Sequence, residues 1–195
     1  MARVSRKEAE QHRNDVIKAA SRLIPERGID GVSVPALMAE AGLTHGAFYG
    51  QFPSKEALVA AACDAVFADR CRFYDDFVAR YAEDGEAGRI AFIKRYTRPI
   101  HRDSWAEGCP MASLCGEVAR PERAGAVRKA FTNGLSSLIQ RLGTLIAGKR
   151  KKVSQEEVLA TVSMLVGALV LSRATEGQPI SDEFLSAARK ALLES

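Results

Sequence analysis

The chain has 195 residues, of which 47% are hydrophobic and 27% charged, and its formal net charge is +4. This length and balance allow one or two domains with a core of their own, and they exclude a disordered or fibrous chain. The small positive excess is compatible with a nucleic-acid partner but does not require one.

The amino terminus, Met-Ala-Arg-Val-Ser-Arg-Lys, lacks the apolar core of a signal peptide. The longest apolar stretch, 158–171, is interrupted by polar residues and glycine and is too short to cross a bilayer. We therefore expect a cytoplasmic protein without membrane contact, in which the four cysteines are reduced. The scattered cysteines and histidines indicate no metal site, and no cofactor is expected.

Apolar residues recur at helical spacing and alternation with period two is nearly absent, so we predict an all-α fold. The first helix should end at Gly28. Ser33 should cap a short helix that ends at Ala41. Thr44 should cap a second short helix, which ends at about residue 51, and Ser54 should cap a long helix. Further helices are expected at about 87–98, 110–119, 121–147, 154–174 and 181–193, which makes nine in all.

Between Gly31 and Leu58, two short helices flank a turn built on Ala41-Gly42-Leu43. Gly42 permits the positive φ that such a turn needs. A small core beneath the turn is expected from Leu37, Met38, Leu43 and Phe48. Such a core would hold the second helix outward, as in a helix-turn-helix that reads DNA.

This segment, with Ala-Gly-Leu-Thr at 41–44, Phe-Tyr at 48–49 and Ser-Lys-Glu-Ala-Leu at 54–58, resembles the TetR family of bacterial transcriptional regulators. The Gly-Cys-Pro stretch from Gly108 resembles one subgroup of that family. The resemblance implies a nine-helix TetR-like fold, with a DNA-binding domain at 1–53 and a ligand-sensing and dimerisation domain at 54–195. It also implies a homodimer that binds operator DNA and represses transcription. An unknown small-molecule inducer or thiol modification would release the dimer from the DNA.

The resemblance assigns DNA contacts to seven residues. Base edges would be met at the amino end of the second short helix by His45, Gly46 and Ala47. Phosphates would be contacted by Ser33, Thr44, Tyr49 and Lys55. The alternatives are that Tyr49 is a half-buried support for Phe52 and that His45 is merely exposed. Arg3, Arg6 and Lys7 are candidates for a basic arm ahead of the first helix.

Bulky side chains in the second half could line a ligand cavity or simply fill the core; the candidates are Phe73, Phe77, Phe92, Tyr96, Trp105, Met111 and Phe131. Cys109 joins them as a candidate sensor, because Pro110 after it indicates a helix start, where amide donors stabilise a thiolate. A buried structural thiol is the alternative. A helical thiol enzyme that uses Cys109 with His101 as base is a competing function, but no third orienting residue accompanies the pair, so we predict no enzyme.

The helix at 154–174 is apolar around too much of its circumference for one core-facing stripe, which predicts a partner subunit. The predicted dimer interface consists of Val162, Leu165, Val166, Leu169, Phe184 and Ala188. A DNA-architectural protein without a ligand is the remaining alternative, and the excess apolar lining of the second half argues against it.

Overall fold

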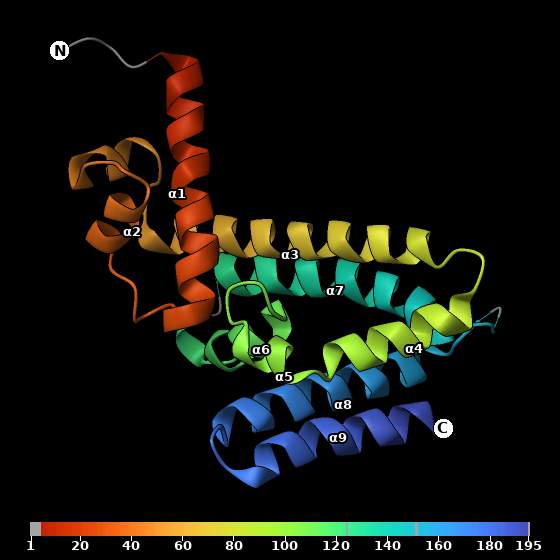
Figure 1. Cartoon of the computed structure of the whole chain (residues 1–195). Helices are drawn as coiled ribbons and strands as arrows, with labels where there is room; N and C mark the ends of the chain where they lie inside the picture. The colour runs from red at the N-terminus through yellow and green to blue at the C-terminus, as the bar shows by residue number, and fades with distance from the viewer. Residues whose placement is uncertain (1–4, 124, 151, 195) are drawn as a thin grey trace.

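The computed structural model describes residues 5–123, 125–150 and 152–194, and throughout these ranges the chain is helical without a strand (Figure 1). The predicted all-α fold is confirmed. The elements are α1 (Arg6–Arg27), α2 (Val34–Glu40), the 3₁₀ helix η1 (His45–Gly50), α3 (Lys55–Arg80), α4 (Gly85–Tyr96), α5 (Pro99–Asp103), α6 (Pro110–Val118), the 3₁₀ helix η2 (Pro121–Arg123), α7 (Ala126–Ala147), α8 (Gln155–Ala174) and α9 (Pro179–Leu193).

The serine caps that the sequence predicts for α2 and α3 are present, and Ser154 caps α8 in the same way. The hydroxyls of Ser33, Ser54 and Ser154 each accept the backbone N–H three residues further on, and so begin α2, α3 and α8. Gly28 ends α1 with a φ of 79°. The starts of α2, α3 and α8 were therefore predicted to within about one residue, whereas α4, capped by Asp84, begins two residues earlier than predicted.

Three elements differ from the prediction. The second short helix, η1, is a 3₁₀ helix in which the Thr44 hydroxyl makes no capping bond, and its Gly46 and Gly50 are poor α-helix formers. The short helix α5 was not predicted. The predicted helix at 121–147 is divided into η2 and α7, because the Glu56 carboxylate of α3 accepts the Ala126 N–H (3.2 Å) and caps α7 there.

Helices α3 and α7 run side by side in the same direction along the length of the molecule, and α1 crosses the amino-terminal end of α3 (Figure 1). Helices α3 and α7 approach closely at Gly134 of α7, where an added Cβ would lie 2.3 Å from Cγ of Phe67 in α3. The buried Phe67 ring also packs edge-on against Phe131 of α7, with centroids 5.4 Å apart. This seam joins the amino-terminal helices to the rest of the protein.

Helices α8 and α9 form an antiparallel hairpin on the opposite side of the molecule from α3 (Figure 1). By length and composition α8 could cross a membrane, so the prediction from the shorter stretch 158–171 was wrong on this point. That prediction judged only this apolar stretch, whereas the whole of α8, from Gln155 to Ala174, carries few charges. In the structure, 44% of the most apolar part of α8 is buried within the protein.

Candidate nucleic-acid interface

The turn between α2 and η1 is fixed by backbone geometry. Gly42 has a φ of 70°, which L-residues with a side chain rarely adopt. The Leu43 N–H donates to the Met38 carbonyl at 2.8 Å. Beneath the turn, Leu37 and Met38 are fully buried. The end of α2 is therefore rigid, and it sets the direction in which η1 leaves it.

Buried aromatic rings anchor η1. Phe48 and Phe52 are each 1% exposed, and their rings stack with centroids 5.9 Å apart. Arg13 of α1 lies 4.2 Å above the Phe52 ring and donates to the Gln51 carbonyl. Sequence reasoning counted Arg13 only as part of a positive bias and missed this role. Its contacts hold the carboxyl end of η1 against α1.

The outer face of η1 carries most of the predicted DNA contacts. Thr44, His45 and Gly46 are exposed, and Ala47 is half-buried. The Tyr49 side chain is 71% exposed, which excludes its alternative as a half-buried support. The His45 and Tyr49 rings approach edge-on, with centroids 6.2 Å apart. One short rigid segment thus presents an imidazole and a phenol to solvent.

The two predicted phosphate contacts outside η1 lie at helix starts. Ser33 is exposed, and its hydroxyl accepts the Ala36 N–H (3.3 Å). Lys55 is the first residue of α3 and is half-buried. Its charge helps to lower the pKa of the Asp30 carboxyl, for which the main cause is a hydrogen bond from Arg123. A phosphate contact by Lys55 stays a prediction.

The predicted basic arm is wrong for two of its three residues. Arg6 and Lys7 belong to the first turn of α1, which opens with a capping box between Ser5 and Glu8. They are therefore helical and do not form an arm. Arg3 lies outside the described residues.

The segment after α1 is bonded to α6 and η2. The Glu117 carboxylate of α6 accepts the Ile29 N–H at 2.6 Å. Asp30 forms an ion pair with Arg123 of η2. These bonds link the helix-turn-helix directly to α6 and η2, so that a displacement of α6 would be felt at the end of α1.

A cavity of about 230 Å³ lies between α3, α4 and α5. Of the predicted pocket residues, Phe73, Phe92 and Tyr96 line it. The other candidates lie elsewhere: Phe77 packs behind Phe73, Trp105 lies 39% exposed under the Arg173 guanidinium, Met111 is in the core, and Phe131 packs on Phe67. Sequence reasoning missed the arginines of the lining, Arg70, Arg95 and Arg98, because it searched only for bulky apolar side chains.

Cys109 is the N-cap residue of α6, with Pro110 after it, as the sequence predicts. Its side chain makes no capping bond and is only 3% exposed. It faces the Tyr96 hydroxyl, whose pKa is raised by burial and by the nearby thiol. The pKa of the Cys63 thiol is raised to about 12, and those of Cys71 and Cys115 are also raised, in each case mainly by burial.

The thiol-enzyme alternative finds no support in this geometry. The His101 ring bonds through Nδ1 to the Tyr96 carbonyl (2.7 Å), and burial lowers the pKa of His101 to about 4. Within the described part of the chain, no hydrogen bond joins His101 to Cys109. The pair is therefore not arranged as base and nucleophile.

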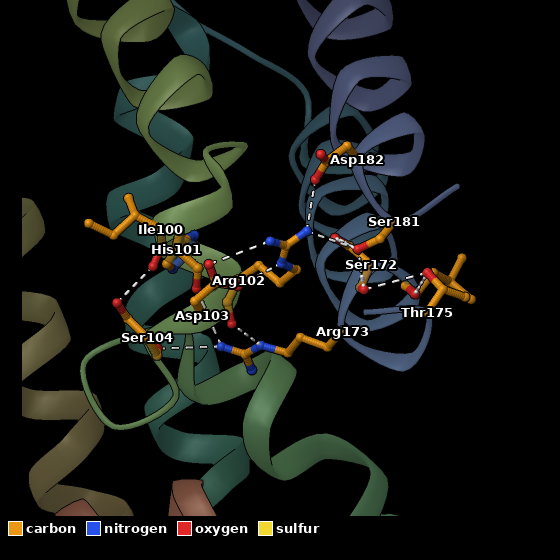
Figure 2. Close-up of polar contacts among 11 residues, drawn as sticks. Ile100, His101, Arg102, Asp103, Ser104, Ser172, Arg173, Thr175, Ser181 and Asp182 are labelled. Atoms are coloured by element: carbon orange, nitrogen blue, oxygen red, sulfur yellow. Dashed lines mark hydrogen bonds and ion pairs between the residues drawn. The ribbon is translucent and has the colours of Figure 1, made fainter. Parts of the chain in front are cut away.

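Figure 2 shows how α5 is held against α8 and α9 by two arginines. Arg102 of α5 donates to Asp182 (2.8 Å) and Ser181 (3.0 Å) at the start of α9. Arg173 of α8 donates to the Arg102 carbonyl (2.9 Å) and to the Ser104 carbonyl (3.5 Å). The α5 wall of the cavity is thereby connected to the α8–α9 hairpin.

Most of the residues predicted for a dimer interface are buried within the chain itself: Val162, Leu165, Leu169 and Ala188 are at most 7% exposed. They fill the contacts of α8 and α9 with the rest of the protein and are not free for a partner. Val166 and Phe184 are half-buried. The apolar side chains that remain exposed on α8 are different ones, namely Leu159, Met164, Val170 and Leu171.

Comparison with known proteins identifies the amino-terminal part of the chain. Residues 16–62 match the family described as bacterial regulatory proteins, tetR family. A stretch of 49 residues is 39% identical to the uncharacterized HTH-type transcriptional regulator YerO of Bacillus subtilis (strain 168). This match covers 25% of the chain and only 17% of that relative's length.

Solved structures match over nearly the whole chain. E. coli NemR in its reduced form is 19% identical, with a TM-score of 0.79 over 94% of this chain and 95% of that one. A TetR-family transcriptional regulator from Cytophaga hutchinsonii is 20% identical, with a TM-score of 0.76 over 99% and 98%. At such identities the likeness shows the fold alone, and it does not test the Gly-Cys-Pro subgroup motif.

Proposed function

We propose that the chain is a TetR-type regulator, namely a cytoplasmic, sequence-specific DNA-binding repressor of transcription, because residues 16–62 match the tetR family of bacterial regulatory proteins. The observation that carries this proposal is the exposed face of η1 on its buried aromatic anchor. A rigid segment with His45 and Tyr49 turned to solvent is suited to entering a major groove. In this proposal residues 1–53 bind DNA and residues 54–195 regulate that binding.

Within this function the seven assigned residues divide into two groups. His45, with Gly46 and Ala47 beside it, meets base edges and supplies sequence discrimination. The phosphate group consists of Ser33, Thr44, Tyr49 and Lys55, whose hydroxyl and ammonium groups position the protein on the duplex. Phosphate contacts supply most of the affinity, and base contacts supply the choice of site.

Operator binding requires two reading heads, and the exposed apolar stripe of α8 supports a homodimer. Leu159, Val170 and Leu171 lie on this stripe, between 37% and 47% exposed. Gly167 lies among them, and a Cβ added there would meet open space within its own chain. Small residues allow two helices to approach closely, so a second copy of α8 would bury this stripe in a four-helix interface with α9.

Release of DNA would follow from a change in the regulatory half. Either a ligand in the cavity or modification of Cys109 would displace the start of α6. The other end of α6 carries Glu117, which holds the Ile29 N–H. A shift of α6 would therefore move α1 and the reading head relative to the dimer axis.

Footprinting on the DNA upstream of the protein's own gene tests this function. We expect protection of two half-sites related by a two-fold axis, because a symmetric dimer reads a palindrome. Tyr49→Phe should weaken protection, whereas Tyr81→Phe, a matched change at the end of α3 far from η1, should not. Binding without any sequence preference, or equal effects of the two variants, would contradict the proposal.

A further inference from the structure

We propose that the cavity between α3, α4 and α5 binds a small aromatic carboxylate, whose ring packs on the aromatic wall and whose carboxylate is held by Arg95 and Arg98. This inference rests on the proposed function, since it names the chemical class of the inducer. Three properties of the cavity carry it: its size, its wall and its charge.

The size of the cavity suits a ligand of about one ring with a short substituent. The cavity has a volume of about 230 Å³. A cavity of about 150 Å³ is enough for benzene, and drug-sized ligands occupy about 300–1,000 Å³. A single ring with a carboxylate fits between these limits.

The wall is a continuous row of aromatic rings. Phe73, Tyr74, Phe92, Tyr96 and His101 follow one another with centroids between 4.5 and 5.9 Å apart, and all five line the cavity. Neighbouring rings are steeply inclined, between 65° and 81°. A further aromatic ring at the cavity could add to this row in the same edge-to-face geometry.

The charge of the lining is positive. Three arginines, Arg70, Arg95 and Arg98, face one carboxylate, that of Glu107. His101 does not add to this charge near neutral pH, because burial lowers its pKa to about 4. The net positive field at the cavity favours an anion over a neutral or cationic ligand.

The Arg70 side chain is already hydrogen-bonded within the protein, whereas those of the other two arginines are not. Arg70 donates to the Glu107 and Gly108 carbonyls and so holds the loop before α6. Across the described residues, the guanidinium N–H groups of Arg95 and Arg98 have no hydrogen-bond or ion-pair partner; Arg95 only lies 4.9 Å from the Phe73 ring. Their planar, forked donors match the two oxygens of a carboxylate.

The position of the cavity also explains how such a ligand would act. Ile100, His101 and Ser104 belong to α5 and the residue that follows it, and they form one side of the cavity. The same segment is held to α8 and α9 by Arg102 and Arg173 (Figure 2). A ligand carboxylate that draws Arg98 toward itself would displace the neighbouring α5. This displacement would strain the hydrogen bonds that Arg102 and Arg173 make.

The test is calorimetric titration of the full-length protein, without DNA, using benzoate as the probe. Benzamide is the matched neutral ring, and acetate is the carboxylate without a ring. For a ligand of this size we expect a benzoate Kd between about 0.1 and 1 mM, with benzamide at least about tenfold weaker. Acetate should not bind measurably at the same concentrations.

Site-directed variants locate the binding. Arg95→Gln and Arg98→Gln should each weaken benzoate binding about three- to tenfold, because each removes a rim charge that is partly screened by solvent. Benzamide affinity should be unchanged, which also shows that the variants are folded. Arg80→Gln at the exposed end of α3 is the control and should bind benzoate like the wild type.

Absence of saturable benzoate binding at millimolar concentrations would overturn the inference, as would equal affinities for benzoate and benzamide. Full benzoate affinity in both arginine variants would overturn it too. None of these results depends on DNA, so a protein that still gives a footprint but ignores benzoate would refute this inference and leave the proposed function intact.

Discussion

Replacing Gly134 by alanine should destabilise the protein, although alanine is the better helix former. The added Cβ would lie 2.3 Å from Cγ and 2.6 Å from Cβ of Phe67, distances that real Cβ atoms do not tolerate. Phe67 is 1% exposed and packs edge-on against Phe131, so its ring cannot simply turn away. Helices α3 and α7 must therefore separate locally. Overpacking of this kind lowers the free energy of unfolding by about 1–3 kcal/mol, and the gain in helix propensity offsets at most about 1 kcal/mol of that loss.

Gly143→Ala in the same helix is the matched control. Its added Cβ would lie 3.6 Å from Cγ2 of Val158, which is an ordinary van der Waals contact. Because no clash arises at this position, only the higher helix propensity of alanine acts. This variant should therefore be more stable than the wild type by about 0.5–1 kcal/mol.

Urea unfolding followed by circular dichroism measures both effects, provided that the denaturant dependence of the free energy of unfolding is unchanged. The two variants should move the midpoint in opposite directions. If Gly134→Ala is as stabilising as Gly143→Ala, the α3–α7 seam is looser than described.

Three further predictions concern DNA binding, assembly and the thiol. Lys55→Ala should reduce the salt dependence of operator affinity by the equivalent of one phosphate, a slope change of about 0.9 in a binding titration; an unchanged slope would remove Lys55 from the interface. Val170→Glu should yield a folded monomer in sedimentation equilibrium, because it puts a carboxylate on the exposed stripe of α8; a stable dimer would place the interface elsewhere. Treatment with iodoacetamide, read by peptide mass spectrometry, should modify Cys109 ahead of Cys63, whose thiol pKa of about 12 keeps it protonated; if Cys109 stays unmodified, it is structural and not a sensor.

The sequence was most informative where one residue decides a local structure. Ser33, Ser54 and Ser154 satisfy free amides at helix starts, and Gly28 and Gly42 adopt a positive φ, so these boundaries could be predicted without tertiary contacts. The helix-turn-helix was predictable for the same reason. Its core and its turn lie within one short stretch of sequence.

Other features depend on contacts between distant residues. The start of α7 is set by Glu56, seventy positions earlier, which no local pattern reveals. For α8, the sequence indicated too many apolar residues for one core-facing stripe but could not say which face meets the chain's own core. Leu165 and Leu169 turned out to be core residues, whereas Val170 is on the exposed stripe. The cavity charge was missed because only bulky apolar side chains were considered, and because Arg70 and Arg95 come from different helices that meet only in the fold.

The central claim, that the exposed face of η1 reads base sequence, is tested most directly by binding of wild type and His45→Ala to a set of operators that differ at single base pairs. We predict that His45→Ala loses about 1–3 kcal/mol of discrimination at one position in each half-site and keeps it at the others. If discrimination survives unchanged at every position, or falls equally at all of them, His45 does not read the operator and η1 does not enter the groove as described.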